Sequence, residues 1–220
     1  HSDHGCVDLV INDLRKYMPK CKHIITLHGF YETMNEHDLK TIIPKICKKV
    51  DFLVYTADKN LGAFKQYGLI DKNKTLKIGN ALARTEINQI SRKDLGINEE
   101  AFVFCVVSRA IPEKGWEEAI RCVDAARRLS GRDIQLLIIG DGAERERLQP
   151  QAGQYVHFLG FKSNIRDYFA ISDMGLLPSR FRGESFPLVI IDCLFAGKPV
   201  LASDIGEVRY MMTTQNNKMA

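Results

Sequence analysis

From residue 101 onward, short apolar runs alternate with amphipathic segments. The apolar, β-branched runs predict buried strands at residues 101–107, 134–140, 156–160, 174–178 and 199–203. The segments between them carry helical spacing or helix-boundary residues and predict helices at residues 115–129, 143–149, 164–172 and 187–196. Five strands that alternate with helices of suitable length predict a parallel, doubly wound α/β sheet.

The earlier part of the chain shows a similar but less regular pattern. It predicts strands at residues 23–29, 50–57 and 75–80, and helices at residues 7–18, 39–50 and 60–68. We expect Pro44 either to bend the helix at 39–50 or to delay its start.

Three regions follow from these patterns. We interpret residues 1–85 as the C-terminal part of an N-terminal Rossmann-like domain whose first strands are missing. Residues 86–100 are interpreted as a linker, within a polar and irregular stretch that begins at residue 81. Residues 101–220 are interpreted as a second Rossmann-like domain whose C-terminal end is missing. The chain opens HSDHG without Met, so we expect it to be a fragment that lacks both ends.

Composition narrows the class of protein. With 45% hydrophobic and 26% charged residues, the 220-residue chain is typical of a globular protein. Its longest apolar runs fall well short of the roughly 20 residues that span a bilayer. The six cysteines include no C-x-x-C pair, which argues against a zinc site or a redox motif and favours free thiols in a reducing cytoplasm. We therefore expect a cytoplasmic protein.

Positive charge gathers in the first part of the chain. Residues 1–85 hold 14 Lys and Arg against 9 Asp and Glu, although the net charge of the whole chain is only +4. The basic clusters are Arg15, Lys16, Lys20, Lys22 and Lys40, Lys45, Lys48, Lys49. They suit an anionic membrane surface or a phosphorylated acceptor, with solvated helix faces as the alternative. Nucleic acid is disfavoured as a partner because the clusters lack interleaved aromatic residues and a recognisable binding motif.

Candidate chemistry lies just after the predicted strands, because ligands of open α/β sheets bind beyond the carboxyl ends of the strands. The residues found there are Arg109, Lys114, Gly140, Gly142, Arg180, Arg182 and Glu184. An Arg fork and a Lys point charge suit a diphosphate, although either residue alone could be a solvated loop residue. The GDG turn is not a G-x-G-x-x-G fingerprint, so it is either a tight turn or a close approach to a nucleotide.

The helix at 187–196 carries two further features. Its start at Phe186-Pro187 offers free backbone N–H groups and a partial positive charge, which suit phosphate. Asp192 shares a face with Leu188, Phe195 and Ala196. Burial of an unpartnered carboxylate costs several kcal/mol, so Asp192 requires a partner. That partner is either a structural hydrogen bond to a neighbouring loop or a pair of ribose hydroxyls.

A carboxylate pair for a metal-held diphosphate is absent from the sequence, since no D-x-D occurs in it. Arginine, lysine and a helix N-terminus can stabilise a diphosphate without a metal. We therefore expect no metal site and no cofactor.

These segments resemble the group 1 (family 4) retaining glycosyltransferases of the GT-B fold. The resemblance is carried by VVSRAIPEKGWEEAI, LLIIGDGAERERL, VHFLGFKSNIRDYFAISDMGLLPSR and GESFPLVIIDCLFAGKPVLASDIGEV. The last is the most specific, because the family has two glutamates with seven residues between them. TLHGF, VDFLVYTADKNLGAFKQYG and LKIGN match the late part of the family's first domain. The implied architecture is two Rossmann-like domains facing a cleft, with the first domain incomplete.

The resemblance also implies roles for single residues. Glu184 matches the acid that contacts hydroxyls of the donor sugar, and Asp192 matches the acid that holds the nucleotide ribose. Arg109 and Lys114 match the pair that grips the diphosphate. The helix start under the phosphates corresponds to Phe186, Pro187, Leu188 and Val189. His1 matches a histidine of the first domain that reaches the donor sugar.

Two positions depart from the family pattern. Asp192 stands where Glu is usual, so its carboxylate is one methylene shorter and its contact with the ribose is weaker or bridged by water. Ala81 follows Asn80 where the family usually has glycine, which stiffens the linker turn.

The implied function is transfer of a sugar from a nucleotide-sugar donor to an acceptor hydroxyl with retained anomeric configuration. The implied partners are that donor and a carbohydrate or lipid-linked acceptor in polysaccharide or glycolipid synthesis, with peripheral contact at the inner membrane face. Two alternatives stay open at this point. One is a non-catalytic GT-B-like subunit that binds a nucleotide sugar, which the Asp192 departure favours, and the other is a sugar-nucleotide epimerase on the same fold.

Overall fold

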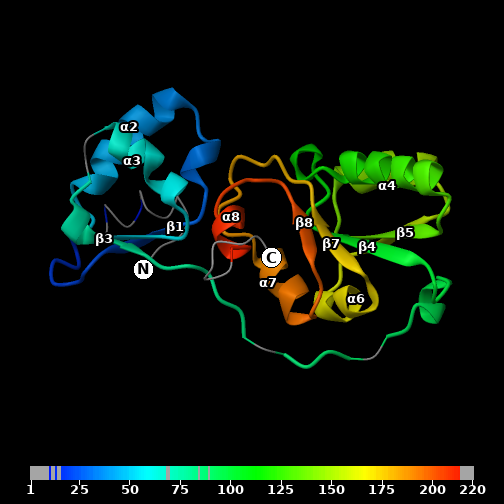
Figure 1. Ribbon diagram of the computed structural model, residues 1–220. Helices are drawn as coiled ribbons and strands as arrows, with labels where there is room; N and C mark the ends of the chain where they lie inside the picture. Colours follow the sequence, from blue (N-terminus) through cyan, green and yellow to red (C-terminus); the bar gives the residue numbers. More distant parts are fainter. Residues whose placement is uncertain are drawn as a thin grey trace. The chain divides into compact units, whose positions relative to one another are not determined.

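The structure is a computed structural model that describes residues 10, 13, 16–67, 70–83, 85–88 and 90–213 (Figure 1). The chain divides into two compact units. The first contains the described residues of 1–80 together with segments 182–187 and 205–213, and the second contains those of 81–181 and 188–204. Each unit is described by itself.

The second unit is built on a five-stranded parallel sheet with the order β6-β5-β4-β7-β8. Its strands are β4 (Phe102–Val107), β5 (Ile134–Ile139), β6 (Val156–Gly160), β7 (Met174–Leu177) and β8 (Val200–Ala202). Its α-helices are α4 (Trp116–Ser130), α5 (Ala143–Leu148), α6 (Ile165–Ile171) and α7 (Leu188–Phe195). The strands and helices therefore alternate along the chain as the apolar pattern predicts.

Both faces of this sheet are covered by helices. Alternate residues of β5 point to opposite faces: Leu136 and Ile138 pack in a cluster with α4 and α5, and Leu137 and Ile139 pack in a cluster with α6 and α7. Figure 1 shows α4 on one side of β4 and β5 and α6 on the other. The arrangement confirms the predicted doubly wound α/β sheet.

Strand order creates a switch point in this sheet. The chain runs from β4 outward through β5 to β6, then returns to the other side of β4 for β7 and β8. Because all five strands are parallel, their carboxyl ends lie along one edge, here called the carboxyl edge. The connections leave β4 and β7 in opposite directions, and sheets of this type bind ligands at such a switch point.

The first unit is built on a three-stranded parallel sheet with the order β1 (Ile24–Leu27), β2 (Phe52–Tyr55) and β3 (Thr75–Lys77). Its α-helices are α2 (Glu36–Cys47), α3 (Gly62–Gln66) and α8 (Val208–Met211). Residues of β1, β2, α2, α3 and the turn just before α3 form its core, namely Ile25, Leu27, Ile43, Ile46, Leu53, Leu61 and Phe64. The loops of both units contain short 3-10 turns at Tyr31–Thr33, Asp58–Leu61, Lys72–Lys74, Lys93–Leu95, Pro112–Lys114 and Gln149–Gln151.

Of the two effects predicted for Pro44, the delayed start of the helix is wrong, and the bend stays a prediction. Helix α2 begins at Glu36, eight residues before Pro44, because the Asn35 side chain caps it by accepting a hydrogen bond from the Asp38 backbone N–H at 2.9 Å. The capping residue decides the start, and Pro44 lies inside the helix. Most of the predicted helix at 7–18 lies outside the described residues. Among the helices that the structure does describe, none is long and apolar enough to cross a membrane.

Candidate functional site

Two cations lie over one aromatic ring at the switch point between β4 and β7. Arg109 follows β4, and Lys114 ends the 3-10 turn in the same loop. Their charged groups lie 5.5 Å and 4.9 Å from the ring centroid of Phe181, which follows β7. Contacts of this kind place a guanidinium and an ammonium on the face of an aromatic ring. The structure thus brings together the two cations that the sequence predicts for a diphosphate.

The loop that carries these cations is packed tightly against the end of β7. Gly115 has φ +74°, and a Cβ there would lie 2.3 Å from the backbone oxygen of Pro178. The backbone N–H of Arg180 donates to the Glu113 carbonyl at 2.8 Å. At the base of the loop, the indole Nε1 of Trp116 donates to the hydroxyl of Ser108 at 2.8 Å. These contacts fix the backbone on both sides of Lys114.

The GDG turn packs against the same loop. Gly140 and Gly142 have φ angles of +138° and +137°, and added Cβ atoms would lie 1.8 Å and 2.7 Å from the carbonyl oxygens of Ser108 and Ala110. The Ala110 N–H donates to the Asp141 carbonyl at 2.8 Å. Close packing of two backbones therefore explains both glycines. The approach of a nucleotide to this turn stays a prediction.

Asp192 has the partner that its burial demands. Its Oδ1 accepts a hydrogen bond from Nε of Arg166 on α6 at 2.7 Å, and the two side chains are 13% and 9% exposed. A buried carboxylate in an apolar helix is thus balanced by a buried guanidinium on the neighbouring helix. The role of Asp192 toward a ribose stays a prediction.

A cavity of about 530 Å³ lies beside this ion pair. Its lining comes from the segment before the second unit's first strand, from the start of α6 and from α7. The residues are Leu82, Ala83, Thr85, Glu86, Asn88, Ser163, Asn164, Ile165, Arg166, Asp167 and Asp192. Eight of these eleven residues carry hydroxyl, amide or charged side chains, so the cavity offers polar partners to a ligand.

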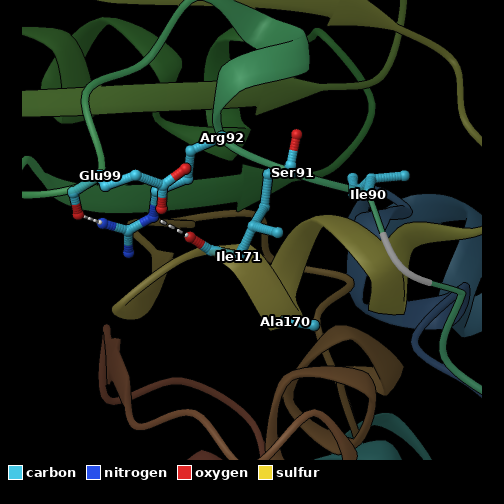
Figure 2. Close-up of a pocket in the computed structure, with 6 residues that line it drawn as sticks. All are labelled: Ile90, Ser91, Arg92, Glu99, Ala170 and Ile171. Atoms are coloured by element: carbon cyan, nitrogen blue, oxygen red, sulfur yellow. Dashed lines mark hydrogen bonds between the residues drawn. The ribbon is translucent and has the colours of Figure 1, made fainter.

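A second cavity, of about 490 Å³, is lined by residues that precede β4 and β7 along the chain, away from the carboxyl edge (Figure 2). Arg92 lines it and donates to the carbonyls of Ile171 at 2.9 Å and Glu99 at 2.7 Å. The same guanidinium binds the Ala101 carbonyl and Asp173, which precede β4 and β7. These bonds occupy Arg92 in holding the chain together, and the cavity includes none of the predicted site residues.

Glu184, Phe186 and Pro187 lie in the segment 182–187 of the first unit. Their segment is held at both ends. Lys59 Nζ donates to the carbonyl of Arg182 at 2.6 Å, and Asn80 Nδ2 donates to the carbonyl of Phe186 at 3.1 Å. Burial lowers the pKa of Lys59, and the nearby carboxylates of Glu32 and Glu184 oppose that shift.

The same segment passes the carboxyl end of β1. A Cβ on Gly29 would lie 2.0 Å from the Gly183 carbonyl oxygen, and the Asn60 amide donates to the Ser185 hydroxyl at 2.8 Å. His28 directly follows β1 and is exposed. Its neighbour Gly29 is the residue that approaches Gly183. His1, the predicted histidine, lies outside the described residues.

The side chain of Arg180 is held by an ion pair within the second unit. Its guanidinium forms an ion pair with Glu118 of α4. Arg182 is exposed on the first unit. Within the described part of the second unit, the cations over the Phe181 ring are Arg109 and Lys114, and Arg180 is not one of them.

Sequence reasoning missed Arg166, Asp167 and His28. From the sequence, Arg166 and Asp167 look like solvated charges at the start of a helix. In the structure they are only 7% and 1% exposed. A charged pair directly before the apolar Tyr168-Phe169 was the available signal. For His28, the rule that ligands bind beyond strand ends would have found it if applied to the first unit as it was to the second.

Parts of the chain are similar in sequence to curated glycosyltransferases. The chain is 32% identical to the α-D-kanosaminyltransferase of Streptomyces kanamyceticus over 130 residues, which cover 55% of this chain and 32% of the relative. It is 26% identical to the putative teichuronic acid biosynthesis glycosyltransferase TuaC of Bacillus subtilis over 193 residues, 84% of this chain and 48% of the relative. The chain thus spans less than half the length of these two relatives.

Among solved structures, the fold is similar to that of Anabaena Alr3699/HepE in complex with UDP, with a TM-score of 0.73 and 22% identity over 94% of this chain and 60% of that one. The protein therefore has the α/β architecture of GT-B glycosyltransferases. Residues 87–219, more than half of the chain, match the family described as glycosyl transferases group 1. By that match, the chain belongs to the group 1 glycosyltransferases.

Proposed function

We propose that the chain binds the donor of a retaining, metal-independent glycosyltransferase, which moves a sugar from a nucleotide sugar to an acceptor hydroxyl. The observation that carries this proposal is the pairing of Arg109 and Lys114 over Phe181 at the switch point of the sheet. Relatives named for teichuronic acid synthesis and for phosphatidyl-myo-inositol mannosyl transfer support polysaccharide or glycolipid synthesis as the setting.

The chemistry assigned to the two cations follows from charge. Transfer breaks the bond between the anomeric carbon and a diphosphate oxygen, so negative charge grows on the departing nucleotide. Arg109 and Lys114 stabilise that charge as it forms, because their positions are fixed before the reaction begins. Two fixed cations supply the electrostatic stabilisation that a metal ion provides elsewhere.

The remaining roles come from the family resemblance. Glu184 contacts hydroxyls of the donor sugar, and Asp192 holds the ribose. The helix start at residues 186–189 binds phosphate through its backbone, and the turn at 140–142 admits the nucleotide. His28 is the described histidine that follows a strand of the first unit, and we assign it to the sugar side in place of His1.

The acceptor side is proposed from charge alone. The basic residues around α2 include Lys40, Lys45, Lys48 and Lys49. They fit a lipid-linked or anionic acceptor and peripheral contact with the inner membrane face.

Product analysis tests this function. The chain is incubated with UDP-, GDP-, ADP- or CMP-sugars and candidate acceptors, with EDTA present, and the products are analysed by NMR. The proposal expects release of nucleotide from one donor class, undiminished by EDTA, and a glycosidic product with the donor's anomeric configuration. An inverted product or an absolute need for a divalent cation would contradict the retaining or the metal-independent part. Binding of a donor without release of nucleotide would instead indicate a non-catalytic module.

A further inference from the structure

Arg166 is a buried guanidinium whose hydrogen bonds reach two separate parts of the second unit. Its Nε donates to Oδ1 of Asp192 on α7 at 2.7 Å. Its Nη1 donates to the Ala83 carbonyl at 2.9 Å and to the Thr85 hydroxyl at 2.8 Å. A single side chain thus joins α7 to the segment that enters the second unit.

The position of this guanidinium is strongly constrained. The residue is 7% exposed, and its Cζ lies 4.7 Å from the ring centroid of Phe195, one turn beyond Asp192 on α7. A planar fork that is stacked and bonded on several sides has few alternative rotamers. Among the described residues, Arg166 is the one hydrogen-bond partner of the Asp192 side chain, so its placement decides where that carboxylate lies.

The neighbouring residue of α6 holds the same entering segment. Asp167 accepts hydrogen bonds from the backbone N–H and the side-chain amide of Asn88, at 2.8 Å and 3.3 Å. Ala83 and Thr85 are therefore attached to α6 through Arg166, and Asn88 is attached through Asp167. The 530 Å³ cavity lies among these groups, and both Thr85 and Asp192 line it.

This arrangement limits how freely the Asp192 carboxylate can turn. The Asp192 side chain is short, and a carboxylate on its own can turn about two torsions. Arg166 removes that freedom through one carboxylate oxygen, and the other, Oδ2, accepts no hydrogen bond from the residues that the structure describes. A carboxylate oriented in advance binds a hydroxyl at a lower entropic cost than a mobile one.

We propose that Arg166 is a positioning residue that couples the orientation of Asp192 to the attachment of Ala83 and Thr85. This inference rests on the proposed function, in which Asp192 holds the ribose of the donor. Loss of the Thr85 bond loosens Arg166, and a loosened Arg166 releases Asp192, so changes in the entering segment alter nucleotide affinity. In the reverse direction, a nucleotide bound at Asp192 tightens residues 83–88.

Four variants of the 220-residue chain separate these steps. Arg166→Lys keeps the charge but loses the fork that serves Asp192 and Thr85 together. Thr85→Val removes one hydroxyl, and Thr85→Ser is its matched control because it keeps that hydroxyl. The fourth is the double variant Arg166→Lys with Thr85→Val. Fluorescence of Trp116, the single tryptophan, checks that each variant is folded.

Affinity for UDP, GDP, ADP and CMP is measured by calorimetry, and hydrogen exchange of the amides in 82–88 is measured with and without the nucleotide that binds. Loss of one hydrogen bond to a charged group corresponds to roughly a tenfold to hundredfold change in Kd. We expect Arg166→Lys to weaken binding by about that factor and Thr85→Val by about three- to tenfold. Thr85→Ser should bind as the parent does, and the effects in the double variant should be less than additive. Exchange at 82–88 should slow on binding in the parent and stay unchanged in Arg166→Lys.

Each contrary result has a distinct meaning. A parent that binds a nucleotide, with Arg166→Lys and Thr85→Val binding equally well, overturns the inference and leaves the proposed function standing. Equal losses in Thr85→Val and Thr85→Ser overturn the coupling, since the hydroxyl is then not the link. Lower stability with an unchanged Kd reduces Arg166 to a purely structural role. A folded parent that binds none of the four nucleotides overturns the proposed function, and this inference with it.

Discussion

Gly115 offers a direct test of how the loop after β4 is held. Substitution by Ala leaves charge and polarity unchanged and adds a single Cβ. That atom would lie 2.3 Å from the Pro178 backbone oxygen. No side-chain rotation can relieve the contact, because the backbone fixes the positions of both the Cβ and the oxygen. The loop or the end of β7 must move, and Lys114 moves with it.

The predicted loss in the free energy of unfolding of Gly115→Ala has two parts. A left-handed φ of +74° costs an L-residue about 1–2 kcal/mol, and forced overpacking adds about 1–3 kcal/mol. Gly131 is the matched control, because its φ is +66° and an added Cβ would meet nothing within 4 Å. Gly131→Ala should therefore lose only the first part. The difference between the two variants isolates the contact with Pro178, at about 1–3 kcal/mol.

The assay uses the chain's single tryptophan. Trp116 follows Gly115 directly and is 1% exposed, so its fluorescence reports unfolding of the second unit. With a urea m-value of about 1–3 kcal/mol/M, the midpoint of Gly115→Ala should fall roughly 1 M below that of Gly131→Ala. Nucleotide affinity should fall in Gly115→Ala only. Equal midpoints for the two variants would refute the reasoning, since the close approach to Pro178 would then carry no constraint.

Three further predictions concern groups away from this loop. Burial raises the pKa of the Cys193 thiol to about 11, so at pH 8 iodoacetamide should alkylate exposed Cys122 at least about 100-fold faster, as mass spectrometry of timed digests can show. Burial lowers the pKa of His157 in the folded protein below 6.5. The stability that the neutral imidazole contributes is therefore present above pH 6.5 and is lost as the pH falls toward the folded-state pKa. His157→Gln should flatten the change in urea midpoint between pH 7.5 and 5.5. Asp192→Asn leaves the Arg166 guanidinium buried without a counter-charge and should lower the free energy of unfolding by about 3 kcal/mol in the same urea assay, whereas an unchanged midpoint would mean that the ion pair contributes nothing.

Local pattern predicted the second unit well, for a physical reason. Strands buried on both faces must be apolar at nearly every position, and a run such as IQLLII has few other ways to bury itself. The helices between the strands were readable from apolar spacing and from boundary residues such as Pro187 and Gly197 at the helix 187–196. Strand order was not readable, because nothing in the sequence of β7 states that it pairs with β4 rather than with β6.

The candidate site was predicted only in part. Arg109 and Lys114 were found because they follow a strand, and that position is a local property. The Arg166 partner of Asp192 was missed because the pair depends on how α6 and α7 pack, and the two residues are 26 positions apart. The glycines at 140 and 142 were ambiguous for the same reason, since the backbone that they approach belongs to a loop more than 30 residues earlier. Pro44 misled because the Asn35 cap outweighs it at the start of α2.

The central claim is that Arg109 and Lys114 form the diphosphate subsite of a nucleotide-sugar donor. Calorimetric titration of UDP, GDP, ADP and CMP into the chain, into Lys114→Ala and into Lys93→Ala tests it most directly. Lys93 is the control because it is an exposed lysine of the same unit, in the turn that precedes β4. The account predicts that one nucleotide binds without added metal, that Lys114→Ala weakens it by roughly tenfold to hundredfold, and that Lys93→Ala leaves it unchanged. Equal binding to all three proteins would contradict the claim and place any nucleotide site elsewhere on the chain.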